Sequence, residues 1–331
     1  MSGDLVVLIT GASCGIGLET ARSLASNPDY GKILLACRNL KKTEIALSSF
    51  DPEARKKCFL FPLDLSSLVS VEECVLLILK ENVRINRLVL NAGVNDYTNS
   101  QCRTTIDGFD EIWQVNYLSH FYLVLLLWDI VDRVVALSSF MHWFGSPERF
   151  IELARPTWIN KYDYYSNSKL AMAVFAHELN KRGKEAVAVN PGAVGSDIFR
   201  TWDKWVKVCL RTTLLTCSDG CKTSVYACTR ESGGFEYLSP YGQISNWGNF
   251  FACISDMYWF HVAKDEKNFI GKCSSIVMSE VPGRVLWNSS IKALCESSKE
   301  RQYLEKWLYV EIFCVYSIIM CIFLSIHLYT R

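Results

Sequence analysis

Six short apolar runs interrupt the chain up to residue 189, and segments of helical length separate them. The runs are Leu5–Ile9, Ile33–Cys37, Cys58–Leu63, Arg87–Leu90, Val134–Leu137 and Ala186–Val189. This alternation is typical of βαβ units, whose strands pair in parallel. Because the crossovers of such units are almost always right-handed, few topologies fit. The sequence therefore predicts an α/β fold with a doubly wound, Rossmann-type parallel sheet and helices on both faces.

The composition of the chain excludes two broad kinds of site. Half of the 331 residues are hydrophobic and the formal net charge is +1, so the chain can bury a large core but has no overall basic field for nucleic acid. The 14 cysteines are scattered, without a CxxC pair or a cysteine–histidine cluster of zinc spacing. We interpret them as free thiols in a reducing compartment, and predict neither a metal site nor a nucleic-acid partner.

A glycine-rich loop follows the first apolar run and precedes a helical pattern from Leu18 to Leu24. Its residues include Thr10, Gly11, Ser13, Cys14, Gly15, Ile16 and Gly17. A dinucleotide pyrophosphate needs this context: the first glycine permits a tight turn, the second a close backbone approach and the third close packing of helix on strand. The helix N-terminus adds free N–H groups. The loop predicts a dinucleotide cofactor; the alternative is a strand–helix turn without a ligand.

The second apolar run ends in a basic residue, Arg38, followed by Asn39. A site for NAD usually carries an acidic residue near this point, to bind the ribose 2′-hydroxyl. An arginine instead suits a 2′-phosphate, because its paired N–H groups match the phosphate oxygens. The sequence favours NADP(H) and leaves NAD(H) possible. The alternative is an arginine that is merely exposed on the surface.

Tyr165 and Lys169 are four residues apart and fall on one face of a predicted helix. A nearby ammonium favours the phenolate form of a tyrosine and lowers its pKa, so that the tyrosine can act as a general acid or base near neutral pH. Neither Tyr162 nor Tyr164 has a lysine at the fourth following position. On its own, such a pair is common on helix surfaces.

An ordered set of motifs supports the pair. From Thr10 to about Tyr237 the chain resembles the short-chain dehydrogenase/reductase superfamily through Thr10-Gly11…Gly15-Ile16-Gly17, Asp64-Leu65, Asn91-Ala92-Gly93, Asn116, Ser138-Ser139, Tyr165…Lys169 and Pro191-Gly192. Finer matches resemble the retinol dehydrogenase-like branch: Ala36-Cys37-Arg38-Asn39, Asp107-Gly108-Phe109, Ser168-Lys169-Leu170-Ala171 and Phe175…Glu178-Leu179. The 3-ketosteroid reductase group, with a similar Tyr-Ser-x-Ser-Lys sequence, is the second resemblance.

The resemblance implies a catalytic set of Asn116, Ser139, Tyr165 and Lys169. Tyr165 would exchange a proton with the substrate oxygen, and Ser139, with Ser138 as the alternative, would polarise the carbonyl. Lys169 would lower the tyrosine pKa and hold the nicotinamide ribose, and Asn116 would position a water. Besides the glycine loop, Tyr165 and Lys169, the implied cofactor-binding residues are Arg38, Asn39, Asp64, Leu65, Asn91, Ala92, Gly93, Pro191, Gly192, Val194 and Ser196.

The C-terminus contains an apolar stretch, residues 308–328, with a single charged residue, Glu311, near its start. Its length matches a bilayer span. Lys299, Arg301 and Lys306 precede it, and the positive-inside tendency then places the main domain in the cytosol. The alternative is a buried core helix. We therefore expect a catalytic domain over residues 1–240, an extension over 241–307 that completes the substrate side, and a single-pass anchor in a membrane such as the endoplasmic reticulum.

These observations together predict an oxidoreductase that transfers a hydride between NADP(H) and a hydrophobic carbonyl or alcohol, such as a retinoid, steroid or lipid aldehyde. The alternatives are a 3-ketosteroid reductase of sterol synthesis, a catalytically silent nucleotide-binding scaffold, or a soluble sugar or polyol reductase, which the C-terminal span disfavours. A homodimer is possible, because the helix after Asn116 often carries subunit contacts in this family. His142 lies near Ser139 in sequence, and we expect a structural or surface role for it.

Overall fold

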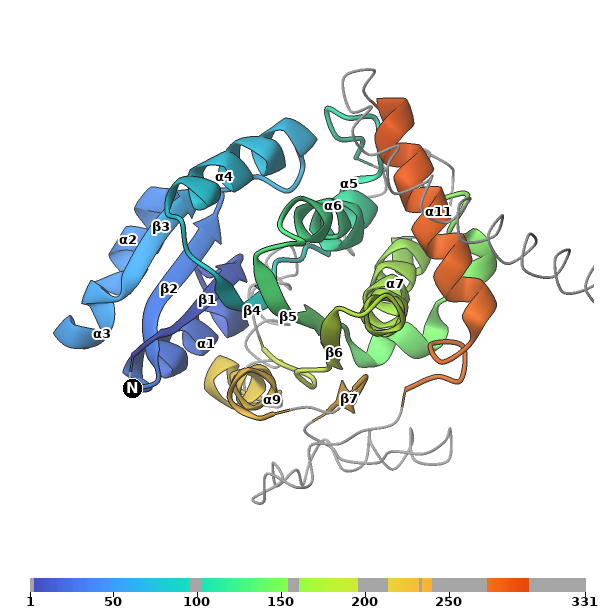
Figure 1. Cartoon of the computed structure of the whole chain (residues 1–331). Helices are drawn as coiled ribbons and strands as arrows, with labels where there is room; N and C mark the ends of the chain where they lie inside the picture. Colours follow the sequence, from blue (N-terminus) through green and yellow to red (C-terminus); the bar gives the residue numbers. More distant parts are fainter. Residues whose placement is uncertain are drawn as a thin grey trace, which may run out of the picture.

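A computed structural model describes residues 3–95, 103–153, 161–195, 214–231, 234–239 and 273–297. In these ranges seven strands form one parallel sheet in the order β3-β2-β1-β4-β5-β6-β7 (Figure 1). The strands are β1 (Leu5–Thr10), β2 (Tyr30–Cys37), β3 (Cys58–Pro62), β4 (Ile85–Leu90), β5 (Val131–Leu137), β6 (Glu185–Val189) and β7 (Tyr237–Leu238). The predicted parallel α/β sheet is confirmed, and the reversal of strand order at β1 and β4 marks the edge where such sheets bind ligands.

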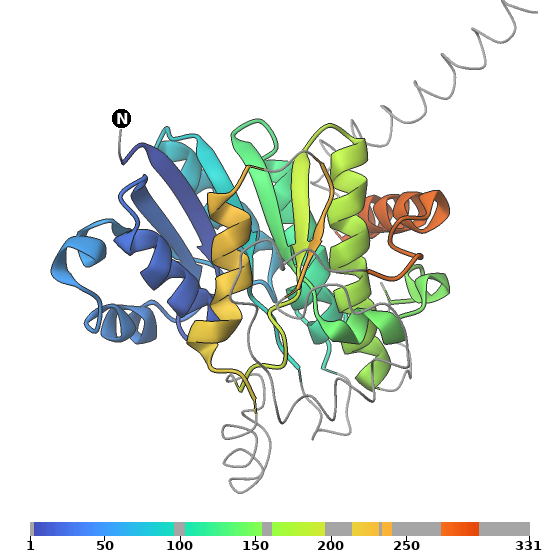
Figure 2. The same ribbon diagram turned by 90° about the horizontal axis from the view of Figure 1, so that it is seen from below.

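Helices cover both faces of the sheet. Below the sheet in Figure 1, α1 (Gly15–Ser26) and α9 (Cys217–Thr229) pack side by side, as Figure 2 also shows. Three other helices cover the opposite face: α4 (Leu68–Lys80), α6 (Ser119–Leu126) and α7 (Lys161–Lys181). The remaining elements are α2 (Leu40–Leu47), α3 (Pro52–Lys56), α5 (Glu111–Trp113), the π-helical turn η1 (Gln114–Leu118), the 3₁₀ turns η2 (Phe140–Phe144) and η3 (Pro147–Arg149), and α11 (Glu280–Ser297).

The strands are apolar without alternation because both of their faces are buried. In β1, Val7 and Ile9 belong to the core under α1 and α9, whereas Leu8 belongs to the core under α4, α6 and α7, and all three are fully buried. All six predicted strands are present. β7, which was not predicted, is only two residues long and extends the sheet beside β6.

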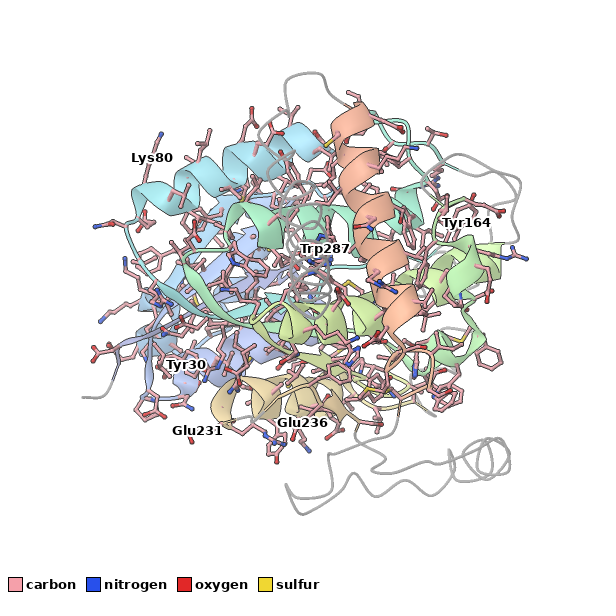
Figure 3. The ribbon with its side chains drawn as sticks, turned by 45° about the vertical axis from the view of Figure 1, so that its right-hand side comes forward. Tyr30, Lys80, Tyr164, Glu231, Glu236 and Trp287 are labelled. Atoms are coloured by element: carbon pink, nitrogen blue, oxygen red, sulfur yellow. The ribbon has the colours of Figure 1, made fainter. Side chains whose placement is uncertain are left out.

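The outermost helix, α11, packs against α7, and its Trp287 closes the contact (Figure 3). The indole ring lies 5.0 Å from the ring of Phe121 on α6 and 6.3 Å from that of Phe175 on α7, and is 1% exposed. The helix that follows Asn116 is therefore covered by a later segment of the same chain. This part of the predicted extension shares the core of the sheet.

The described helices include none that is both long and apolar enough to cross a membrane. The predicted span at residues 308–328 lies outside the described residues, as does the segment 240–272. The domain boundaries drawn at 240 and 307 therefore remain predictions.

Candidate active site

The glycine loop joins β1 to α1 at the carboxyl edge of the sheet. Gly11 has a φ of +68° and Gly15 a φ of +63°, which only glycine adopts readily. A Cβ on Gly11 would lie 2.8 Å from the Cα of Ala92, and one on Gly17 would lie 2.3 Å from Nδ2 of Asn91. The loop is thus held so close to the end of β4 that no side chain fits at either position.

The N-terminus of α1 differs from those of the neighbouring helices. The residues that precede α2, α3 and α4, namely Asn39, Asp51 and Ser67, each accept a backbone N–H with their side chains. Cys14, at the same position before α1, makes no such hydrogen bond. The first N–H groups of α1 are thus not capped by that side chain. A pyrophosphate is the ligand that such N–H groups suit, so this part of the chain fits a dinucleotide.

Thr10 and Asn91 fasten the loop to β4. Nδ2 of Asn91 donates to the carbonyl oxygens of Thr10 at 2.8 Å and Gly11 at 3.1 Å. The Thr10 hydroxyl accepts the N–H groups of Asn91 and Ala92, each at 3.0 Å. The resemblance implies that Asn91 binds the cofactor; the structure shows its amide nitrogen bound to the protein's own loop.

His120 connects this loop to Asn116, a link that sequence reasoning missed. The ring is fully buried, and burial lowers its pKa to about 4, so it is neutral at physiological pH. Nε2 lies 2.9 Å from the Thr10 hydroxyl, and Nδ1 lies 3.1 Å from the carbonyl oxygen of Asn116. Because that hydroxyl already accepts two N–H groups, it donates to Nε2, and Nδ1–H donates to Asn116. A helical i, i+4 pairing of histidine with asparagine was the only available signal.

Asn116 lies in the π-helical turn η1, a kind of turn frequent at functional sites. Its Oδ1 accepts the N–H of Val94 at 2.7 Å, and its Nδ2 donates to the Val94 carbonyl at 3.0 Å and to Oγ of Ser168 at 3.1 Å. A Cβ on Gly93 would lie 3.4 Å from this Oδ1 and 3.5 Å from Nζ of Lys169. The structure therefore brings Asn116, Gly93 and Lys169 together.

Tyr165 and Lys169 share one face of α7, as predicted. Nζ of Lys169 lies 5.7 Å from the centre of the Tyr165 ring and donates to the Leu137 carbonyl at 3.1 Å. Burial lowers the pKa of this ammonium to about 8. Tyr165 is 7% exposed, whereas the neighbouring Tyr164 is fully buried. Of these two tyrosines, Tyr165 is the one with some access to solvent and with the lysine beside it.

The paired serines at the end of β5 have different surroundings. Oγ of Ser138 donates to the Lys169 carbonyl at 2.7 Å. Oγ of Ser139 accepts the N–H of Met141 at 3.2 Å, which leaves its own proton free to donate. Ser138 is thus engaged within the protein, and Ser139 keeps the donor that a substrate carbonyl needs.

The remaining candidates follow the ends of β2, β3 and β6. Arg38 is exposed beyond β2, and Asn39 caps α2. Oδ1 of Asp64 accepts the N–H and the hydroxyl of Ser66, and Leu65 between them is buried. After β6, Oδ1 of Asn190 accepts the N–H of Gly192, and Val194 packs against Gly220. Pro191 lies between Asn190 and Gly192. Ser13 lies in the turn of the glycine loop, Ile16 lies in the first turn of α1, and Ser196 lies outside the described residues. The described residues contain no cluster of three or more potential metal ligands.

The sequence of the chain is similar to a known protein family and to several known proteins. The family model described as short chain dehydrogenase matches residues 5–142. The chain is 36% identical over 249 residues to the WW domain-containing oxidoreductase of Gallus gallus, covering 68% of this chain and 58% of that protein. It is 38% identical over 205 residues to retinol dehydrogenase 12 of Mus musculus, covering 59% of this chain and 63% of that protein. The chain thus spans about three fifths of the length of these two relatives.

Solved structures share the fold at lower identity. An uncharacterised protein from Mycobacterium paratuberculosis superposes with a TM-score of 0.63 at 24% identity, covering 88% of this chain and 93% of that one. The NADPH-bound carbonyl reductase from chicken fatty liver gives a TM-score of 0.53 at 17% identity, covering 72% and 97%. At these identities the superpositions support the fold alone.

Proposed function

The chain belongs to the short-chain dehydrogenase/reductase superfamily and resembles its retinol dehydrogenase-like branch, and from this premise we propose that it is an NADP(H)-dependent oxidoreductase of hydrophobic carbonyls and alcohols. The family uses nicotinamide cofactors, and bound NADPH would supply the hydride. The observation that carries the proposal is the convergence of Lys169, Asn116 and the Tyr165 ring at the carboxyl edge of the sheet, beside the glycine loop.

In the proposed reduction, the Tyr165 hydroxyl donates a proton to the substrate oxygen. The Ser139 hydroxyl donates a hydrogen bond to the same oxygen and stabilises the charge that develops there. Lys169 lies close enough to the Tyr165 ring for its ammonium to favour the phenolate that remains. Asn116 holds η1 in place beside Lys169 through its bonds to Val94 and Ser168.

Two features support a phosphorylated dinucleotide. The N-terminus of α1 carries no side-chain cap and suits the pyrophosphate. Arg38, exposed at the end of β2, suits the 2′-phosphate of NADP(H) through its paired N–H groups. Asp64, engaged with Ser66 next to the end of β3, is the proposed neighbour of the adenine.

A hydrophobic substrate and a membrane anchor form the second part of the proposal. Some of the relatives are named retinol dehydrogenases, and residues 308–328 have the length and apolarity of a span. α11 begins beside the end of α7, where Glu280 approaches Lys181, and by Ser290 it reaches Tyr117, next to Asn116. The helix that precedes the proposed anchor therefore runs toward the edge of the sheet that carries the site. Anchoring would raise the rate at which membrane-dissolved substrates meet the enzyme.

A turnover screen tests the proposal. Full-length protein in detergent or vesicles is mixed with NADPH or NADH and with all-trans-retinal, a 3-ketosteroid, a long-chain aldehyde or a polar sugar aldehyde. We expect oxidation of NADPH, faster than of NADH, with at least one apolar carbonyl and not with the sugar. NADPH binding without turnover on any carbonyl would indicate a silent scaffold, and a clear preference for the sugar would contradict the hydrophobic assignment.

A further inference from the structure

His142 follows Ser139 by three residues and lies where three separate parts of the chain meet. It belongs to η2 and is 1% exposed. Nδ1 lies 2.7 Å from the carbonyl oxygen of Ser139 and 3.1 Å from the hydroxyl of Tyr237 on β7. Nε2 lies 3.2 Å from the backbone nitrogen of Ser274. The ring is therefore a buried side chain with partners on both nitrogens, rather than a surface group.

The partners fix the protonation state of the ring. A backbone N–H can only donate, so the N–H of Ser274 requires Nε2 to be an unprotonated acceptor. The single ring proton then lies on Nδ1 and points at the Ser139 carbonyl, the nearer of its two neighbours. Burial lowers the pKa of His142 to about 4, in agreement with a neutral ring.

Tyr237 and Ser138 extend these contacts to β7 and α7. Its ring centre lies 4.9 Å from that of His142, and burial raises its pKa, so the hydroxyl keeps its proton. That hydroxyl also donates to the Ser139 carbonyl oxygen at 3.4 Å, and the adjacent Ser138 donates from its Oγ to the Lys169 carbonyl on α7. His142 and Tyr237 thereby link the end of β5, β7 and the segment at Ser274, and Ser138 links the end of β5 to α7.

We propose that His142 is a positioning residue of the active site: its Nδ1–H fixes the peptide plane of Ser139, and its Nε2 holds the segment at Ser274 against the same point. The inference rests on the proposed function of Ser139 as the donor to the substrate oxygen. If the Ser139 carbonyl changes its orientation, the backbone rotates and the Ser139 Oγ that projects from it moves. A misplacement of about 1 Å at a reacting group can reduce a rate about 100-fold.

Two substitutions separate the roles of the two nitrogens. In His142→Asn the side-chain amide can keep a donor near the position of Nδ1, whereas in His142→Gln the longer side chain can place an acceptor near Nε2 without that donor. We expect His142→Gln to lower kcat by about 10- to 100-fold, while His142→Asn keeps most of kcat and raises KM. NADPH binding should stay within about twofold of wild type in both variants, because the glycine loop is untouched.

His177→Phe is the matched control. His177 is also a buried histidine, and its ring lies near the backbone of Val277 in the same segment and 5.1 Å from the ring of Phe235; none of the contacts described for it involves Ser139. If loosening of this segment were the whole effect, His177→Phe would lower kcat as much as His142→Gln does. Equal losses in these two variants, or wild-type kcat in His142→Gln, would overturn the proposal.

Hydrogen exchange keeps this test separate from the proposed function. Absence of turnover in the wild type would contradict the proposed function. The exchange rate of the Ser274 amide can still be measured, because it does not depend on activity. We expect faster exchange at this amide in His142→Asn than in the wild type, and near-wild-type exchange in His142→Gln. Unchanged protection in His142→Asn would show that the ring does not hold the segment.

Discussion

Side-chain hydrogen bonds hold the proposed functional residues in both halves of the sheet, but in the half with the glycine loop the backbone is also packed closely against the end of β4. At the glycine loop, the backbone approaches β4 so closely that Gly11 and Gly17 have no room for a Cβ. In the other half the bonds join buried side chains to neighbouring elements: Asn116 on η1 bonds to Ser168 on α7, and His142 after β5 bonds to Ser139. The first half should therefore be sensitive to added atoms, and the second to the loss of buried packing and hydrogen-bonding groups.

The largest effect on stability is expected from Trp287→Ala, which removes the side chain that α11 buries against α6 and α7. Replacing a buried tryptophan by alanine costs about 3–5 kcal/mol. Urea unfolding should show this loss, with faster hydrogen exchange in α6, α7 and α11 than in α1. The control is Val281→Ala on the same helix, at a position that is 61% exposed, where the change should be slight. Equal effects of the two substitutions would contradict the packing described for α11.

An added atom should act most strongly in the other half. Gly11→Ala places a Cβ 2.8 Å from Ala92, and overpacking of this kind costs about 1–3 kcal/mol. If the loop moves to relieve the clash, NADPH binding weakens by about 5- to 150-fold, as titration of NADPH fluorescence would measure. The control is Gly183→Ala, where φ is +80° and nothing lies within 4 Å of the new Cβ. It shares the backbone strain without the clash and should keep wild-type NADPH affinity.

Arg38→Ala removes a proposed ligand-binding group. It leaves both the close packing of the glycine loop and the buried hydrogen bonds of the other half intact. Loss of a phosphate-binding arginine should weaken NADPH binding by about 10-fold, equivalent to about 1.4 kcal/mol, and leave NADH binding unchanged. Arg55→Ala removes another exposed arginine, from α3, and serves as the charge control. Equal weakening of both cofactors in Arg38→Ala would mean that Arg38 does not read the 2′-phosphate.

The two buried histidines, His120 and His142, should make the stability depend on pH. Burial lowers the pKa of both His120 and His142 from 6.5 to about 4. Between these values the unfolded chain binds more protons than the folded one, so this contribution is present above pH 6.5 and is lost as pH falls toward 4. Each histidine contributes a slope of at most about 1.4 kcal/mol per pH unit. Urea unfolding between pH 7 and 4.5 should give a smaller slope for His142→Asn than for wild type; identical slopes would contradict a buried neutral ring.

The parts of the fold that follow from local sequence were predictable. Strands buried on both faces give uninterrupted apolar runs, which is why β1 to β6 could be recognised. β7 could not, because Tyr237–Leu238 is too short to form a pattern and depends on pairing with β6. The place of α11 depends on Trp287 meeting rings on α6 and α7, a tertiary contact that periodicity does not encode.

For the candidate site, the spacing of Tyr165 and Lys169 and the order of the motifs indicated which residues to consider. The surroundings of those residues were not predictable. His142 and Ser274 are 132 positions apart, and Thr10 and His120 are 110 apart. The different surroundings of Ser138 and Ser139 also arise from contacts with other elements, since the two residues are identical and adjacent.

Proton donation by Tyr165 is the central claim, and one measurement tests it most directly. Single-turnover oxidation of bound NADPH by an apolar carbonyl would be followed in wild type, Tyr165→Phe and Tyr164→Phe. Removing a general acid lowers a rate by about 100- to 10,000-fold, so we expect this loss in Tyr165→Phe with NADPH binding retained. Tyr164→Phe, at a fully buried ring beside it, should stay near the wild-type rate. A wild-type single-turnover rate in Tyr165→Phe would contradict the account.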